Sequence, residues 1–301
     1  MTDNLRGILS VLLASTAFVL NDAIIKHVSA ELPSGEIIVV RGVISTAMLF
    51  VCCALLGLMR PLATLMTRPM LVRIAAAAVA TMFIVLALRY LPLATVTTVV
   101  QVTPLAVTAG AAIVYGERVG WRRWLAALTG FLGVVLIVRP GGAIFGGAAY
   151  LAIGALLFTT TRDLTTRGLD RAIPSMFVAA ASSAAITLTG FLVMPFEGPW
   201  LMPPWSALGP LIISGACLLV ANTFMIAAMR TGEIAVVAPF RYAPVPLAVW
   251  LGYLWWGDMP DAVAFIGIAL VIGAGLYTLH CERATLRSPA LQPAADRSPA
   301  P

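Results

Sequence analysis

The chain reads YLPLATVTTVVQVTPLAVTAGAAIVYGE from Tyr90 to Glu117, an apolar stretch that carries no charge until its last residue. About 20 such residues are enough to cross the hydrocarbon core of a bilayer as one helix. The stretch therefore predicts a membrane span near residues 94–115. Pro104 predicts a break within it, because proline lacks the backbone N–H that a continuous helix needs.

The rest of the chain has the same character. Hydrophobic residues make up 60% of the 301 residues and charged residues only 11%, whereas a soluble domain carries about 25% charged residues. Nine further apolar stretches lie near residues 7–25, 37–58, 71–89, 124–138, 147–165, 174–194, 208–229, 234–256 and 262–279. We therefore expect an all-α polytopic membrane protein with ten transmembrane helices in the lipid bilayer.

The second half of the chain repeats the first at one constant offset, which we call the repeat shift. The chemically unusual matches at this shift are Asp22 with Asp163, Lys26 with Arg167, Pro33-Ser34 with Pro174-Ser175, and Gly116-Glu117 with Gly257-Asp258. Apolar residues match by chance in any two membrane helices, but charged residues and glycine–acid pairs rarely align at one shift. Because each copy has five spans, the second copy enters the membrane in the opposite direction, which makes an inverted repeat.

The predicted domains follow from this repeat. Residues 1–139 form the first five-helix unit and residues 140–281 the second, joined by a turn rich in proline and glycine. Residues 282–301 are rich in Pro, Ala, Ser and Arg. Such a composition buries too little apolar surface to order itself, so we expect a disordered cytoplasmic tail.

Lys and Arg fall unevenly on alternate loops. With the N-terminus inside, 14 of the 19 lie on the inner side and three on the outer side, namely Lys26, Arg89 and Arg139. Cytoplasmic loops carry an excess of Lys and Arg, so we expect both termini in the cytoplasm and the chain in the cell (inner) membrane. The basic residues form no arm or stripe, so no nucleic-acid partner is expected.

The sequence offers no metal, cofactor or catalytic motif. The four cysteines lack metal or redox spacing, and the two histidines, His27 and His280, fall on opposite sides of the membrane. A membrane-embedded lipid-modifying enzyme would need clustered acids, histidines or a nucleophile at one face. We therefore expect a protein that is not an enzyme and has no cofactor, and the lipid-modifying enzyme is the weaker alternative.

Several motifs in both halves share their order and spacing with one family. They are Arg41 after Pro33, Tyr90-Leu91-Pro92-Leu93-Ala94, Pro104, Gly116-Glu117-Arg118 and Gly133, then Ala235, Pro239-Phe240-Arg241-Tyr242, Gly252-Tyr253 and Gly257-Asp258-Met259-Pro260. This pattern resembles the EamA-type branch of the drug/metabolite transporter superfamily. The resemblance implies a ten-helix carrier whose central cavity opens alternately to either side, and a small-molecule substrate.

The resemblance leaves the substrate and the direction of transport open. The stretch from Pro239 to Tyr242 is similar to members that take up riboflavin or S-adenosylmethionine. An exporter of amino acids or other metabolites is the alternative within the family.

Five polar residues inside spans are candidates for substrate binding. A charge at mid-membrane is costly, so one that persists there usually faces a cavity or a partner. Arg241 lies between Pro239 and Pro244, two predicted helix breaks, and is expected to bind an anionic or carbonyl group while Tyr242 stacks on a ring; capping of freed carbonyls is the alternative for Arg241. The others are Gln101, Asn222 and Arg41, for which ties between helices, or snorkelling of Arg41 to the interface, are the alternatives.

Two acid–base pairs are candidates for gates. Asp22 with Lys26, and Asp163 with Arg167, are four residues apart and therefore share a helix face. The inverted repeat puts one pair at each membrane surface. Each pair could close one side of the carrier, or be a solvated helix end.

Glycines near the end of each half favour close helix contact. They are Gly130, Gly133, Gly273 and Gly275. Packing within one chain and formation of a homodimer both fit these glycines.

Overall fold

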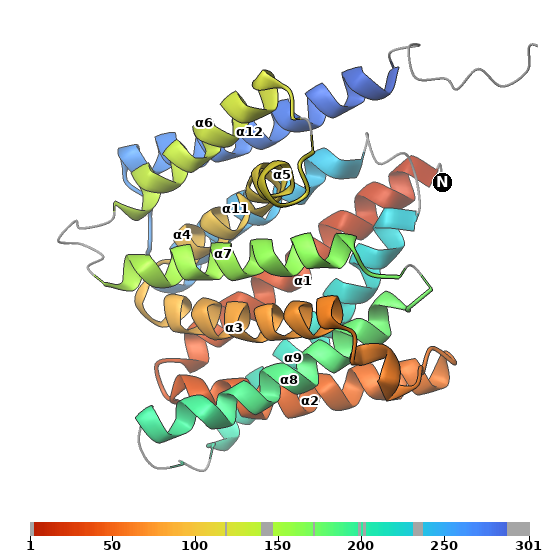
Figure 1. Cartoon of the computed structure of the whole chain (residues 1–301). Helices are drawn as coiled ribbons and strands as arrows, with labels where there is room; N and C mark the ends of the chain where they lie inside the picture. The colour runs from red at the N-terminus through yellow and green to blue at the C-terminus, as the bar shows by residue number, and fades with distance from the viewer. Residues whose placement is uncertain are drawn as a thin grey trace, which may run out of the picture.

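The computed structural model describes residues 3–117, 119–139, 147–170, 172–197, 200, 203–230 and 237–287, which form helices and no strand. The first half contains α1 (Asp3–Val28), α2 (Ser34–Leu55), the 3₁₀ helix η1 (Leu62–Leu65), α3 (Arg68–Tyr90), α4 (Leu93–Val100), α5 (Thr103–Val114) and α6 (Trp121–Val138). The second contains α7 (Ala148–Arg167), α8 (Ser175–Glu197), α9 (Trp205–Arg230), the 3₁₀ helix η2 (Ala238–Tyr242), α11 (Pro244–Trp256) and α12 (Ala262–Arg287). They pack side by side in one bundle (Figure 1).

In the described part of the chain these elements make ten crossings, because α4 with α5, and η2 with α11, each form one interrupted crossing. The predicted all-α architecture with ten spans is confirmed. Eight crossings are long and apolar enough to span a membrane by themselves. The exceptions are α7, which carries three charged residues among 20, and α11, which has only 13 residues.

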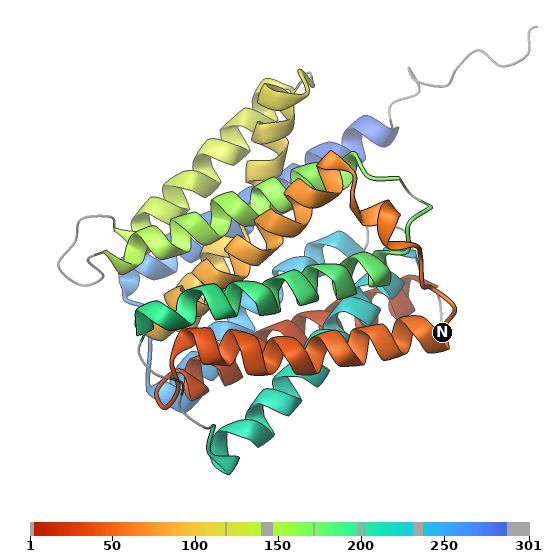
Figure 2. The same cartoon turned by 60° about the horizontal axis from the view of Figure 1, so that its bottom comes forward.

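The helices pair mainly across the two halves. The principal pairs are α1 with α9, α2 with α8, α3 with α7, α4 with α11 and α6 with α12. Figure 2 shows α2 lying along α8. A two-fold axis in the membrane plane explains these pairs. It exchanges α1 with α7, α2 with α8 and α3 with α9, so the contact of α1 with α9 is equivalent to the contact of α3 with α7. Thr46 and Thr187, which the repeat shift equates, lie near that axis with their hydroxyls 3.4 Å apart.

The bundle has two ends, and we call the one that holds both ends of the chain the terminal end and the other the opposite end. The terminal end holds the start of α1 and the end of α12, together with Leu55, Arg68, Val114, Trp121, Arg167, Ser175 and Arg230. The opposite end holds Val28, Ser34, Tyr90, Leu93, Val138, Ala148, Glu197, Trp205, Trp256 and Ala262.

The last helix corrects one prediction. Residues 282–301 were expected to be disordered, but α12 continues to Arg287. Residues 282–287 contain neither Gly nor Pro, and Ser288 precedes Pro289. Because a residue before proline is disfavoured in the helical region, a helix usually ends at or before it. Residues 288–301 lie outside the described residues.

Two glycines bring α6 and α12 into backbone contact. A Cβ atom on Gly133 would lie 2.7 Å from the carbonyl oxygen of Gly267, and a Cβ on Gly267 would lie 2.7 Å from the carbonyl of Gly133. Gly133 was expected to permit close packing, but its partner is Gly267, whereas Gly273 has no atom of a neighbouring element within 4 Å of its Cβ position.

We predict that Gly133→Ala separates α6 from α12 and destabilises the protein by about 1–3 kcal/mol, the usual cost of overpacking. Gly209→Ala in α9 is the matched control, because a Cβ there meets no atom within 4 Å. Alanine is the better helix former by about 1 kcal/mol, so the control should be neutral or stabilising. Thermal unfolding of the two variants in detergent measures the difference, and equal midpoints would show that the contact is absent.

Candidate functional site

Two interrupted helices meet at the centre of the bundle. In the first half α4 ends at Val100 and α5 begins at Thr103, directly before Pro104. In the second half the 3₁₀ helix η2 contains Pro239, and Pro244 is the first residue of α11. Each interruption leaves backbone carbonyls without a helical partner, and such groups need a donor where no water reaches them.

Gln101 supplies a donor for one of these carbonyls. It follows α4, and its side-chain amide donates a hydrogen bond to the backbone carbonyl of Arg241 in η2. The bond joins the break in the first half to the break in the second. Gln101 is half-buried and Arg241 is exposed, so Arg241 is accessible to a solute at this junction.

Tyr242 has a different surrounding from the one expected. Its side chain is only 6% exposed and packs on Gly275 of α12, where a Cβ atom would overlap the tyrosine ring and hydroxyl. The ring therefore offers no free face for stacking on a solute in this structure. Gly275 explains the arrangement, because only a residue without a side chain leaves room for the ring.

Asn222 and Arg41 both lie within the bundle, in different surroundings. The Asn222 amide nitrogen donates to the carbonyl of Leu218, one turn earlier in α9, at 2.8 Å. Arg41 is 4% exposed, so it does not snorkel to the interface. One of its Nη atoms donates to Oδ1 of Asn21 at 3.3 Å.

Arg41 belongs to a buried polar cluster near the opposite end. The Ser214 hydroxyl donates to the same Asn21 oxygen at 2.7 Å, and the Asn21 amide nitrogen donates to Oδ1 of Asp22 at 2.9 Å. Asn21 thus links Asp22 in α1 to Arg41 in α2 and Ser214 in α9. We call Asn21, Asp22, Arg41 and Ser214 the opposite-end cluster.

The sequence suggested a pair of Lys26 with Asp22, but in the structure Lys26 has other partners. Its ammonium lies 3.5 Å from Oδ2 of Asp258, donates to the Leu91 carbonyl at 2.8 Å and stands 5.3 Å from the centre of the Trp256 ring. These partners lie at the ends of α3 and α11, which α1 approaches in the folded protein. Lys26 therefore ties three crossings together at the opposite end.

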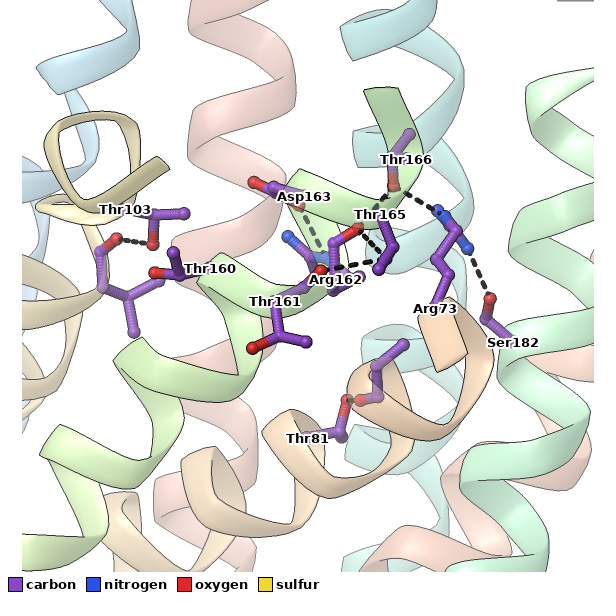
Figure 3. A network of polar contacts seen from close by, with 12 residues as sticks. Arg73, Thr81, Thr103, Thr160, Thr161, Arg162, Asp163, Thr165, Thr166 and Ser182 are labelled. Carbon is purple, nitrogen blue, oxygen red and sulfur yellow. Dashed lines mark hydrogen bonds and ion pairs between the residues drawn. The ribbon is translucent and has the colours of Figure 1, made fainter. Parts of the chain in front are cut away.

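The polar groups near the terminal end form a second cluster (Figure 3). Asp163 accepts a hydrogen bond from Nε of Arg162 at 2.8 Å. Arg73 donates from Nε to the Thr166 hydroxyl at 2.9 Å and from one Nη to the Ser182 hydroxyl at 2.8 Å. We call Arg73, Arg162, Asp163 and Ser182 the terminal-end cluster.

The terminal-end cluster differs from the predicted gate. The predicted partner of Asp163 was Arg167, whose side chain lies outside the described residues, and the partner seen is its neighbour Arg162. Sequence reasoning missed Arg73 and Ser182, because Arg73 was counted only as a basic residue that sets orientation. The missed signal was the repeat shift, which places Arg73 opposite Ser214.

A groove of about 350 Å³ lies between α11 and α12 and contains none of the predicted site residues. It is lined by Pro246, Val249, Trp250, Tyr253, Met259, Phe265, Ile268 and Ile272. A surface without charged groups suits the hydrocarbon of the bilayer rather than a polar solute. The Gln101–Arg241 junction is therefore the better candidate for a solute site.

We predict that Gln101→Leu, which leaves the Arg241 carbonyl without its donor, destabilises the protein by about 1–3 kcal/mol. Asn222→Leu is the matched control, because it removes the same amide from a bond to a carbonyl of its own helix. Thermal unfolding in detergent compares the two variants. If the two variants lose the same stability, the Gln101–Arg241 bond contributes no more than a bond within one helix.

An ion pair beside the start of α12 makes the stability of the protein depend on pH. Arg139 lies 2.6 Å and 2.7 Å from the two carboxylate oxygens of Asp261. The Ala264 backbone N–H and then the Arg139 guanidinium hold the pKa of Asp261 below its usual value of 3.8. Because the folded-state pKa is the lower one, the stabilisation is present above about pH 4 and is lost as pH falls through the folded-state pKa.

Asp261→Asn should therefore lower the unfolding midpoint by a constant amount between about pH 7 and pH 5. Below about pH 4 the two midpoints should converge, because the wild-type carboxyl becomes neutral too. Midpoints measured across this range test the link. A difference that stays constant in acid would contradict it.

Comparisons with known proteins agree with this architecture. Residues 5–139 match the EamA-like transporter family. The chain is similar to the riboflavin transporter of Vibrio cholerae, with 28% identity over 273 residues that cover 89% of this chain and 91% of that one. It is similar to the pseudopaline exporter CntI of Pseudomonas aeruginosa, with 28% identity over 286 residues that cover 89% and 94% of the two chains.

A third relative is the S-adenosylmethionine uptake transporter of Rickettsia prowazekii, with 23% identity over 200 residues, 65% of this chain and 66% of that one. One crystal structure has the same fold, with a TM-score of 0.64, 20% identity and coverage of 93% of this chain and 98% of the other. The expectation of a transporter rather than an enzyme is confirmed. Residues 5–139 thus match the EamA-like transporter family, and the chain is a transmembrane transporter that moves a small organic metabolite across a membrane.

Proposed function

We propose that the protein takes up a planar, polar metabolite of the riboflavin or S-adenosylmethionine type across the bacterial cytoplasmic membrane by alternating access. Two relatives named as carriers of these molecules support this substrate class. Both termini lie in the cytoplasm in this proposal. The excess of Lys and Arg at the terminal end supports that orientation.

The observation that carries the proposal is the exposed Arg241 side chain at the meeting point of the two helix interruptions. A guanidinium presents its donors in one plane and binds a carboxylate or a pair of carbonyl oxygens through two parallel hydrogen bonds. The Gln101 side chain bonds the backbone carbonyl of the same residue. Arg241 binds the substrate in our proposal, and Gln101 fixes the backbone that carries Arg241.

Most of the other predicted site residues take positioning roles, and Asn222 is the exception. Tyr242 and Gly275 hold η2 against α12. Asn222 stays a candidate ligand on α9, while Arg41 holds α1 to α2 through Asn21. Lys26 with Asp258 closes the outer side, and Asp163 belongs to the inner side together with Arg162.

Export is the second candidate. The pseudopaline exporter matches as much of this chain as the riboflavin transporter does, 89% in both cases. Direction in a carrier without a coupling ion follows the substrate gradient, since both faces of one site are used in turn. The test must therefore measure movement in both directions.

We predict that sealed proteoliposomes containing the protein accumulate one member of a panel of labelled riboflavin, S-adenosylmethionine, nucleosides and amino acids. Arg241→Ala should reduce this accumulation by about tenfold or more, because a charged hydrogen bond to a substrate is worth about 1.5–3 kcal/mol. Preloading the vesicles and following efflux measures the reverse direction.

Arg89→Ala is the matched control, because Arg89 lies at the opposite end and donates a long hydrogen bond of 3.4 Å to the Leu32 carbonyl. It should leave accumulation nearly unchanged. Accumulation that persists in Arg241→Ala would remove Arg241 from the site. If the folded protein moves only amino acids, and only outward, its function is export and not uptake.

A further inference from the structure

The two polar clusters occupy equivalent positions in the two halves. The repeat shift maps Asn21-Asp22 onto Arg162-Asp163, Arg41 onto Ser182 and Arg73 onto Ser214. In both clusters a nitrogen of the first residue donates to the carboxylate of the next one, at 2.9 Å from Asn21 to Asp22 and at 2.8 Å from Arg162 to Asp163. The structure thus repeats the sequence equivalence in its contacts.

Arginine and serine exchange places between the clusters. At the opposite end the arginine is on α2 and the serine is on α9, which are Arg41 and Ser214. At the terminal end the serine is on α8, the equivalent of α2, and the arginine is on α3, the equivalent of α9. Each cluster therefore has one aspartate, with one arginine and one serine at the same two positions.

Both clusters join the two halves. The opposite-end cluster connects α1 and α2 of the first half to α9 of the second. The terminal-end cluster connects α7 and α8 of the second half to α3 of the first through Arg73. The contacts of Ser214 and of Arg73 cross between the halves, so in a carrier built as an inverted repeat they are placed to change when one half rocks against the other, whereas the Arg41–Asn21 bond lies within the first half.

The two clusters are not in the same state. Asn21, Arg41 and Ser214 are at most 4% exposed, and both Arg41 and Ser214 reach Asn21. The Arg162 and Asp163 side chains are 36% and 37% exposed. Among the described residues no hydrogen bond joins either of them to Arg73 or Ser182, although Arg73 is close enough to be attracted by Asp163 and repelled by Arg162.

We propose that the two clusters are the alternating clamps of the transport cycle and that Arg41 and Arg73 are their equivalent positioning residues. In this structure the opposite-end clamp is closed, with Arg41 and Ser214 on Asn21. At the terminal end Arg73 bonds Thr166 and Ser182 and, among the described residues, makes no hydrogen bond to Asp163, and this is the open arrangement of that clamp in the proposal. In the other state of the carrier Arg73 reaches Asp163 and seals the terminal end, while Arg41 and Ser214 part from Asn21. The inference rests on transport by alternating access, but it does not depend on which solute is carried.

The exchange of arginine and serine gives the first test. Arg41→Ser removes the buried guanidinium that bonds Asn21 and attracts the neighbouring Asp22 carboxylate, and it should strongly reduce the yield of folded protein. Adding Ser214→Arg returns a guanidinium from α9, the position that the other cluster uses. Size-exclusion profile and thermal midpoint should then recover most of the wild-type value.

Arg41→Ser combined with Ser182→Arg is the matched control, because it adds the same guanidinium at the wrong end. It should not recover. If both double variants fail, the two positions are not interchangeable within a cluster. If both recover equally, recovery does not depend on the end that receives the guanidinium, and either result makes the proposed equivalence wrong.

The second test separates a clamp from a static support. Val19 and Thr160 are equivalent positions, each one turn before the aspartate of its cluster. Single cysteines are placed there after Cys52, Cys53, Cys217 and Cys281 are replaced by Ala. Reaction with a membrane-impermeant maleimide is then followed from each face in right-side-out and inverted vesicles, with Arg41 either kept or changed to Lys.

Arg41→Lys should weaken only the opposite-end clamp. Labelling of Val19→Cys from the opposite face should then rise on the order of tenfold, the scale of a typical coupling between two sites, while labelling of Thr160→Cys from the terminal face falls. Equal changes at both positions, or none at either, would show that Arg41 only supports the fold. Neither readout needs a substrate, so a failure here is distinct from a failure of the proposed uptake.

Discussion

A helix that breaks inside a bilayer must find donors for the carbonyls it exposes, and this requirement shapes the centre of the protein. Water is absent from the hydrocarbon core, so each unsatisfied carbonyl costs several kcal/mol. The break in the first half contributes Gln101, whose amide bonds the Arg241 carbonyl in the second. The two breaks therefore depend on each other. A solute site can exist between them because contact across the halves already stabilises the irregular backbone there.

The inverted repeat explains why that contact can stay while the ends of the bundle change. Gln101 and Arg241 are 140 residues apart, and Thr46 and Thr187 are 141 apart, so both contacts lie near the two-fold axis. Points on an axis move least when two halves rotate about it. Contacts far from the axis, such as Lys26 with Asp258, move most. In the proposed transport cycle the centre therefore stays fixed and the ends switch.

The fold could be predicted from the sequence because bilayer length and residue periodicity determine each crossing locally. The breaks at Pro104 and Pro244 were visible for the same reason. Side-chain partners were harder to foresee, since they depend on how the halves pack. Lys26 and Asp22 share a helix face, yet Lys26 bonds Asp258 because α11 ends beside it. Tyr242 is covered because Gly275 of another helix accepts its ring.

The two polar clusters show what a residue-by-residue alignment of the two halves misses. The repeat shift aligns Arg41 with Ser182 and Arg73 with Ser214, so in a comparison of the two sequences each pair is a mismatch. Only the contacts show that the two mismatches belong together, since Arg41 and Ser214 meet at Asn21, and Arg73 bonds Ser182 directly. A buried aspartate requires a compensating charge, but that requirement does not fix the helix from which the charge comes. The exchange therefore keeps one arginine and one serine in these two positions at each end. The ends still differ, because Arg162 stands where the other end has Asn21, and a carrier that must close one end at a time depends on such a difference.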